Sequence, residues 1–155
     1  AGIKDSLKNI AETGEFVCSL ATWDLRTHMN MSSASVPYGV DEFPLAGLTA
    51  IQSHFVKPPR VKESPVALEC RHFQTIALPG AGRYTQSYNL VIGQIVGVYI
   101  DDRYLRDGIV DTPAMKPIAR LGYMDYAVVG AENTFTLTRP DVDASGHVIP
   151  GSAKG

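Results

Sequence analysis

The chain has 155 residues, of which 45% are hydrophobic and 19% charged, which indicates one folded domain rather than a disordered segment. A formal net charge of −2 gives no broad basic surface, which argues against a nucleic-acid partner. The longest apolar run is broken by Gly93, Gln94 and Gly97 before it reaches the length of a membrane span, so no membrane segment is expected. Fourteen Gly and ten Pro indicate many turns and favour a mainly β fold with short helices.

A short helix leading into a strand is predicted at the start of the chain. Asp5 or Ser6 suits the N-cap because its side-chain oxygen can accept from the free amides of the first turn. Gly14 suits the left-handed residue that ends a helix, and the apolar residues 16–20 predict a buried strand. The helix N-terminus, the Ser6 hydroxyl and the Lys4 ammonium are together the components of an anion site. An ordinary capped surface helix with a solvated lysine explains the same pattern.

Small polar residues cluster after a second predicted helix. Asn30, Ser32 and Ser33 belong to this cluster, and hydroxyls with backbone amides can surround a phosphate or a ribityl chain. Ordinary loops have the same composition. A long irregular loop follows at residues 36–49, and it carries Tyr38 and Phe43. These aromatic residues predict either a lid over a planar ligand or anchors that hold the loop on the core.

A long β-hairpin is predicted in the middle of the chain. Its strands are expected at residues 65–78 and 88–100, with a turn region at residues 79–83. Gly93 and Gly97 are expected to produce bends or bulges that allow the sheet to curl toward a barrel.

Several side chains in and near this hairpin are expected at the surface. Glu69 and Arg71 are predicted to share one face and form a surface ion pair, while the charges of residues 57–60 face solvent. Asp101 and Asp102 end a strand before a loop, so a turn explains them better than a metal site. Two further residues, Cys18 and Cys70, are expected to be buried free thiols, which is typical of a cytoplasmic protein.

The C-terminal third contains shorter elements. Residues 112–116 predict one helical turn, because Thr112 suits its cap and Pro113 its first position. A last strand is expected at residues 134–138. The tail at residues 141–155 is rich in Gly, Pro, Ser and Ala and is expected to be extended or flexible, which leaves residues 1–140 as the folded domain.

An ordered set of motifs resembles the flavin reductase-like proteins, the family of FMN-binding split barrels. The segment KDSLKNIAETGEFV is similar to the Lys/Arg-Asp-Thr-x-x-Asn-Ile-x-x-Thr-Gly-Glu-Phe-Val segment of that family, and further stretches agree in family order at residues 29–33, 42–49, 64–71, 90–102 and 117–122. Family members usually carry further strands before this lysine, so the N-terminal part of the domain is expected to be missing or to lie elsewhere. Tyr99 stands near a position where many members have a His.

The resemblance implies a fold and an activity. The fold would be an FMN-binding split barrel of the antiparallel Greek-key type. The activity would be FMN-dependent NAD(P)H oxidoreduction, with hydride transfer from NADH or NADPH to flavin, in a homodimer that could supply reduced flavin to a monooxygenase partner. No residue is assigned a catalytic role, because the flavin itself carries the hydride chemistry.

The resemblance also implies binding residues. Those expected at the FMN are Lys4, Asp5, Ser6, Asn30, Ser32, Ser33 and Arg120. Those expected at the substrate are Tyr38, Phe43 and Tyr126. For Arg120 and Tyr126, a surface cation and a half-buried strand aromatic are equally ordinary roles. The alternative function is a non-catalytic flavin-binding or other ligand-binding β-barrel module.

Overall fold

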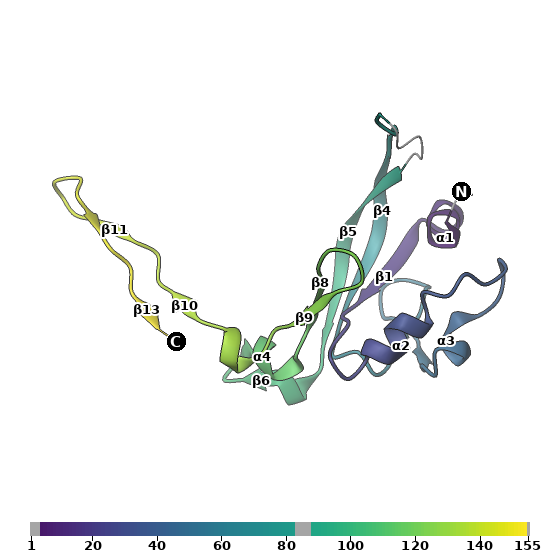
Figure 1. The fold of residues 1–155 in the computed structure, drawn as a ribbon, viewed down its shortest axis with the longest axis horizontal. Coiled ribbons are helices and arrows are strands. Elements are labelled where there is room, and N and C mark those ends of the chain that lie inside the picture. The colour runs from purple at the N-terminus through teal and green to yellow at the C-terminus, as the bar shows by residue number, and fades with distance from the viewer. Residues whose placement is uncertain (1–3, 83–87, 155) are drawn as a thin grey trace.

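The computed structural model describes residues 4–82 and 88–154, and its centre is a three-stranded antiparallel sheet with strand order β1–β4–β5. These strands are β1 (Glu15–Ser19), β4 (Val66–Leu78) and β5 (Tyr88–Ile100). The predicted hairpin strands are therefore confirmed, although Arg83 of the predicted turn lies outside the described residues. Because β4 and β5 are much longer than β1, their outer halves extend beyond it as a two-stranded ribbon (Figure 1).

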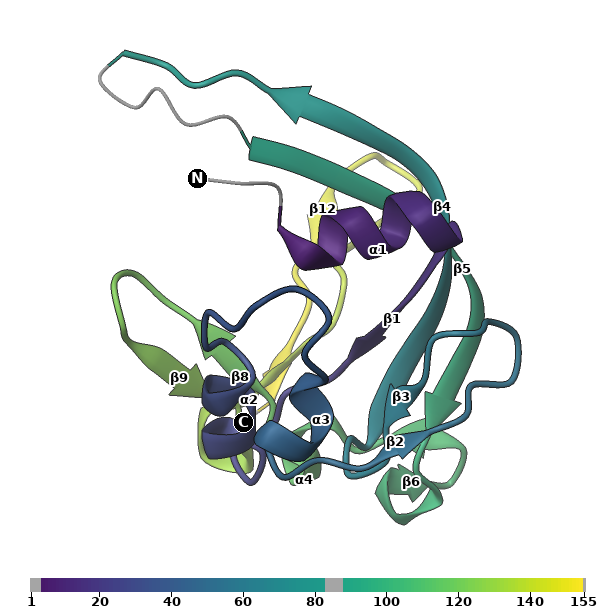
Figure 2. The ribbon, with the colours of Figure 1, turned by 90° about the vertical axis from the view of Figure 1, so that its right-hand side faces the viewer.

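Two irregularities bend this ribbon. The pairing register of β4 with β5 shifts between Glu69 and Cys70 and again between His72 and Gln74, opposite the region of Gly97 and Gly93. Figure 2 shows the ribbon curving along its length. This confirms the expectation that the sheet is irregular where the glycines lie, because a bulge inserts an extra residue and locally bends the strand.

Gly93 and Gly97 are also required because aromatic rings approach the backbone closely at both positions. A Cβ atom added at Gly93 would collide with the Phe16 ring, and one added at Gly97 would collide with the Phe55 ring. The absence of a side chain therefore lets aromatic rings pack directly on the β5 backbone.

Burial of Glu69 overturns the predicted surface pair of Glu69 and Arg71. The unpaired residue at the first register shift is Val96 of β5, and Glu69 lies on the same face of β4 as the buried Ala67 and is only 2% exposed. Its carboxylate accepts hydrogen bonds from the backbone N–H groups of His54 (3.0 Å) and Phe55 (2.6 Å). It thereby fastens the segment before β3 to the sheet.

Two further predictions about burial, those for Arg60 and Cys18, are wrong. Arg60 is 7% exposed rather than solvent-facing, and its guanidinium lies 3.5 Å from the centroid of the Tyr99 ring. Of the two free thiols, Cys70 is buried as expected but Cys18 is exposed. Burial raises the pKa of the Cys70 thiol, and the neighbouring Cys18 adds to that shift. The strand β1 is only half-buried as a whole.

Short helices and strands flank the sheet. Helix α1 (Asp5–Thr13) ends at Gly14, whose φ of 69° is left-handed and whose N–H donates to the Ile10 carbonyl over 2.8 Å, as predicted. Its N-cap is Lys4 rather than Asp5 or Ser6. The remaining elements before β4 are α2 (Arg26–Met31), α3 (Glu42–Leu45), β2 (Ala50–Ile51) and β3 (Arg60–Val61).

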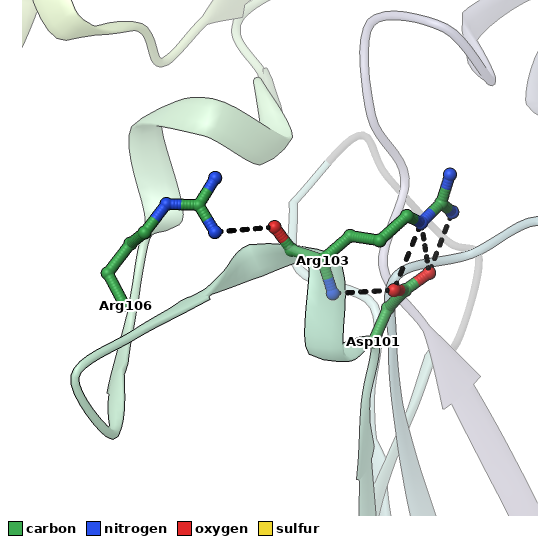
Figure 3. Close-up of polar contacts among 3 residues, drawn as sticks. All are labelled: Asp101, Arg103 and Arg106. Carbon is green, nitrogen blue, oxygen red and sulfur yellow. Dashed lines mark hydrogen bonds and ion pairs between the residues drawn. The ribbon is translucent and has the colours of Figure 1, made fainter.

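A polar corner follows β5. Asp101 is the N-cap of the 3-10 helix η1 (Asp102–Tyr104), and its carboxylate accepts from both the backbone N–H and the guanidinium of Arg103 (Figure 3). Arg106 then donates to the Arg103 carbonyl over 2.9 Å. The hydrogen bonds from Arg103 hold the pKa of Asp101 below its ordinary value. These contacts set the direction of the chain into β6 (Leu105–Arg106) and β7 (Ile109–Val110).

The C-terminal part departs from the sheet. The helix α4 (Thr112–Met115) has Asp111 rather than Thr112 as its cap, and the hairpin of β8 (Ile118–Arg120) and β9 (Tyr126–Val128) follows. After η2 (Ala131–Asn133), β10 (Thr136–Leu137) pairs with β13 (Ala153–Lys154), and β11 (Asp141–Val142) pairs with β12 (Val148–Ile149). Residues 134–154 thus form an arm that extends away from the sheet (Figure 1). Among the described residues, no helix has the length and apolarity needed to cross a membrane.

Candidate functional site

A cavity of about 940 Å³ opens at the N-terminus of α1. Its walls come from three pieces of chain: the start of α1, the polar loop after α2, and the loop that leads into α3. The lining residues are Lys4, Asp5, Ser6, Asn9, 32–36 and 38–43. The structure therefore brings together seven of the ten residues expected at a ligand, namely Lys4, Asp5, Ser6, Ser32, Ser33, Tyr38 and Phe43.

The beginning of α1 presents hydrogen-bond donors to this cavity. No side chain of the described residues caps the helix, so its first-turn amides keep their donor capacity and their partial positive charge. The Lys4 side chain is exposed beside them, and the Ser6 hydroxyl makes no hydrogen bond within the described residues. Amides, a hydroxyl and an ammonium group at one helix end are suited to an anion such as a phosphate.

Ser32 and Ser33, which we call the serine cluster, offer hydrogen-bond acceptors rather than donors to the cavity. The Ser32 hydroxyl donates to the Met29 carbonyl over 2.8 Å, and the Ser33 hydroxyl donates to the Asn30 carbonyl over 2.7 Å. Both hydroxyl protons are therefore used inside the turn, and the oxygen lone pairs remain available to the cavity. Asn30 supports Ser33 through its carbonyl but is not part of the cavity wall.

The two loop aromatics have different positions. The Tyr38 hydroxyl lies 3.3 Å from Asn9 Oδ1 and 3.4 Å from Glu12 Oε2, and Lys8 Nζ lies 3.5 Å from the centroid of its ring. These contacts anchor the loop on α1 while Tyr38 lines the cavity. Phe43 stands at the start of α3, where the Asp41 carboxylate caps its backbone N–H over 3.0 Å.

Phe43 also lines a second cavity of about 740 Å³ that adjoins the first. The two cavities share Ser6, Asn9 and Phe43. The walls of the second cavity come mainly from apolar residues of α1, β1, the loop before β3 and β3 itself, among them Ile10, Phe16, Val17, Pro58, Pro59 and Val61. Sequence reasoning missed this cavity, although the double proline beside an apolar strand was a visible signal. A polar cavity next to an apolar one suits a ligand with a charged end and an apolar body.

Acidic residues limit where an anion can lie. Asp5, Asp41 and Glu42 line the first cavity beside Lys4, the one cation among its described lining residues. A carboxylate repels a phosphate, so Asp5 can contribute to an anion site only through its backbone N–H. The charges therefore favour an anion directly at Lys4 and the first turn of α1.

Arg120 and Tyr126 lie elsewhere. Both belong to the hairpin of β8 and β9, where Arg120 Nη1 donates to the Tyr126 hydroxyl over 2.7 Å. Arg120 Nη2 also donates to the carbonyl of Tyr123, a residue with a left-handed φ of 56°. Neither Arg120 nor Tyr126 lines either cavity. Their observed role is to hold the turn of their own hairpin.

The family model described as "Flavin reductase like domain" matches residues 3–125. An uncharacterized protein of Halalkalibacterium halodurans, BH2278, is 34% identical over 139 residues, which cover 90% of this chain and 65% of that protein. The chain therefore belongs to the flavin reductase-like family.

Solved structures agree on the fold. Nitrilotriacetate monooxygenase component B from Bacillus cereus superposes with a TM-score of 0.75 at 31% identity, covering 83% of this chain and 63% of that one. A protein with a split barrel domain from Shewanella frigidimarina superposes with a TM-score of 0.67 at 26% identity, covering 79% of this chain and 60% of that one. The predicted split-barrel class is thus confirmed. The chain spans less than two thirds of the length of each of these three proteins.

Proposed function

We propose that this protein binds FMN at the N-terminus of α1 and acts as an FMN-dependent NAD(P)H oxidoreductase. One observation carries the proposal: the uncapped start of α1 opens, with Lys4 and Ser6, into a cavity of about 940 Å³. That volume lies within the range of roughly 300–1,000 Å³ that is usual for small-molecule sites. Membership of the flavin reductase-like family supports the identity of the ligand.

The donor set fits the parts of FMN. Lys4, the Ser6 hydroxyl and the first amides of α1, including that of Asp5, would bind the phosphate. Ser32 and Ser33, whose hydroxyl protons are already used, would accept from ribityl hydroxyls. Tyr38 and Phe43 would form the wall against which a ring system packs.

FMN would supply the hydride chemistry with NADH or NADPH, and the residues of this chain would bind and orient it. The cavity residues would exclude water from one side of the ligand and would hold its charged end. The proposal assigns no general acid or base to the chain. Asn30, Arg120 and Tyr126 would act indirectly, by supporting Ser33 and the hairpin of β8 and β9.

The proposal extends to a monooxygenase partner and a homodimer. Its support for the partner is the likeness to a protein that is itself component B of a monooxygenase. In that role the protein would work in the cytoplasm and supply reduced flavin to a second protein. A flavin carrier without reductase activity is the competing function.

A titration of the purified chain with FMN and riboflavin tests the site. Tighter binding of FMN, by about tenfold or more, is expected if Lys4 and α1 bind the phosphate. Anaerobic addition of NADH or NADPH should then bleach the flavin absorbance. Flavin binding without bleaching would identify a carrier instead, whereas a folded chain that binds no flavin would contradict the proposal.

A further inference from the structure

The two cysteines of the chain lie on neighbouring strands of the central sheet. Cys18 of β1 pairs with Leu68 of β4, and Cys70 of β4 pairs with Phe16 of β1. Residues opposite each other in an antiparallel pair share a face of the sheet, as do residues two apart along a strand. Cys18 and Cys70 are therefore diagonal neighbours on one face. The sequence has no third cysteine, and the proposed flavin chemistry uses neither thiol.

The two thiols interact directly across this strand pair. Burial is the largest cause of the raised pKa of Cys70, and a charge interaction and a side-chain hydrogen bond with Cys18 add to it. Cys70 Sγ also lies 3.6 Å from the Leu68 carbonyl oxygen, to which its S–H donates. Two sulfur atoms from different strands thus come together at one point of the sheet.

The pair has one ligand at the surface and one in the interior. Cys18 is exposed, whereas Cys70 is only 4% exposed. The residues paired with Leu68 and Cys70 on β5 are Val98 and Ile95, both apolar. An ion from solvent therefore reaches Cys18 first, and Cys70 completes its coordination from the buried side.

The spacing of the two cysteines suits a bridging ion better than a disulfide. Diagonal neighbours have Cα atoms about 7–8 Å apart, whereas a disulfide needs about 4.4–6.8 Å. Two metal–thiolate bonds of about 2.3 Å each hold the sulfur atoms up to about 4.6 Å apart, compared with about 2 Å in a disulfide. An ion between the thiolates therefore requires less movement of the strands than a direct bond.

The number and type of ligands restrict the ion. Among the described residues, no group of three or more His, Cys, Asp or Glu side chains could hold a metal ion. Zinc is held by three or four protein ligands and calcium or magnesium by several oxygen atoms, so none of them suits two sulfur donors. His72 shares the face of Cys70, but its Nε2 lies 2.8 Å from the Thr75 hydroxyl. Soft thiolate ligands favour Cu(I).

We propose that Cys18 and Cys70 together bind one Cu(I) ion as a two-coordinate bis-thiolate. Two S–H bonds break and two S–Cu bonds form, the two protons pass to solvent, and no electron is transferred. The bound ion ties β1 to β4. The inference is independent of the proposed flavin site, because neither cysteine belongs to the described walls of the two cavities.

An anaerobic titration of the reduced full-length chain with Cu(I) tests the site. Bicinchoninate, a coloured competing chelator of Cu(I), reports the affinity and the stoichiometry, and one ion per chain is expected. Cys18→Ser should raise the Cu(I) dissociation constant about a hundredfold or more, because one thiolate cannot chelate. Its circular dichroism spectrum should stay unchanged, since Cys18 is exposed. The matched control is Met124→Leu, which removes a sulfur atom from a residue that is 82% exposed and should leave the dissociation constant unchanged.

The buried ligand is tested by Cys70→Ala, which should lose as much affinity as Cys18→Ser. The double variant should bind no more weakly than either single variant, because each single change already abolishes the chelate. Cys18→Ser with wild-type affinity would overturn the inference even if Cys70→Ala failed to fold. Half an ion per chain would also overturn it, since Cys18 would then join two chains, and two ions per chain would show that the thiols bind separately.

Discussion

The buried carboxylate of Glu69 accepts a hydrogen bond of 2.6 Å from the backbone N–H of Phe55. Its other oxygen accepts from the N–H of His54 over 3.0 Å. The same segment places the Phe55 ring over Gly97, and a few residues later it forms one wall of the second cavity. The Glu69 side chain of β4 therefore fixes a segment that packs the Phe55 ring on β5 and also forms one wall of the second cavity.

Loss of the Glu69 carboxylate should destabilise the protein. Glu69→Ala removes the acceptor of two backbone N–H groups and should lower the free energy of unfolding by about 2–4 kcal/mol, while Glu69→Gln, which keeps one acceptor, should cost about 1–2 kcal/mol. Urea denaturation followed by circular dichroism measures both. Glu63→Ala is the control, because Glu63 is exposed and, within the described residues, accepts one backbone N–H, from Thr49, over 3.1 Å. Equal losses in Glu63→Ala and Glu69→Ala would contradict the role given to Glu69.

The same carboxylate should make stability depend on pH in the acid range. Burial disfavours the charged form, but the N–H donors of His54, Phe55 and Val56 outweigh burial and hold the pKa of Glu69 below its ordinary value of 4.5. A group whose pKa is lowered by folding contributes its full stabilisation above the unfolded value and loses it as the pH falls through the folded value. The difference in unfolding free energy between wild type and Glu69→Gln should therefore shrink as the pH falls below 4.5. A difference that stays constant there would show that folding does not lower the pKa of Glu69.

The contact of Phe16 with Gly93 predicts a second effect on stability. A Cβ at Gly93 meets the Phe16 ring, so Gly93→Ala should lower the free energy of unfolding by about 1–3 kcal/mol. Combining it with Phe16→Leu should cost less than the sum of the two single changes, because the smaller side chain leaves room. The control is Gly122→Ala, since a Cβ there meets nothing within 4 Å. Additive losses in the double variant would contradict the contact.

Local sequence signals predicted the elements that local chemistry determines. The left-handed Gly14 that ends α1 and the alternating strands of β4 and β5 were found within a residue or two. Glu69, Arg60 and Cys18 were misplaced because their burial depends on packing from distant segments. The N–H groups that contact Glu69 come from His54 and Phe55, and nothing near Glu69 in the sequence indicates that contact.

The candidate site was predicted in part for the same reason. Lys4, Ser6 and the serine cluster come from motifs that a helix end and a short loop determine, and the structure places them around one cavity. Asn9 and Glu42 line it only because the loop of residues 36–43 folds back on α1, where Tyr38 is anchored. Arg120 does not line the cavity because its guanidinium is hydrogen-bonded within its own hairpin. This pairing depends on the conformation of the β8–β9 turn rather than on a motif.

Removal of the lysine charge should affect FMN selectively. Lys4→Ala should raise the FMN dissociation constant about tenfold, because a charge-assisted contact to the phosphate is lost, and should leave riboflavin binding unchanged. Fluorescence quenching measures both ligands. The matched control is Lys62→Ala, which removes the same charge from an exposed side chain that lines neither cavity. Equal effects of the two variants on FMN would mean that only overall charge matters.

The serines around the cavity should differ in their effect on FMN binding. Ser6 has a hydroxyl proton without a partner in the described residues, so Ser6→Ala should remove a donor to the phosphate and weaken FMN binding about fivefold. Ser33 uses its proton on the Asn30 carbonyl, so Ser33→Ala should weaken FMN and riboflavin to the same extent, through the shared ribityl chain. The ratio of the two dissociation constants in each variant separates these roles. If Ser33→Ala changed that ratio more than Ser6→Ala, the phosphate would lie at the serine cluster rather than at the start of α1.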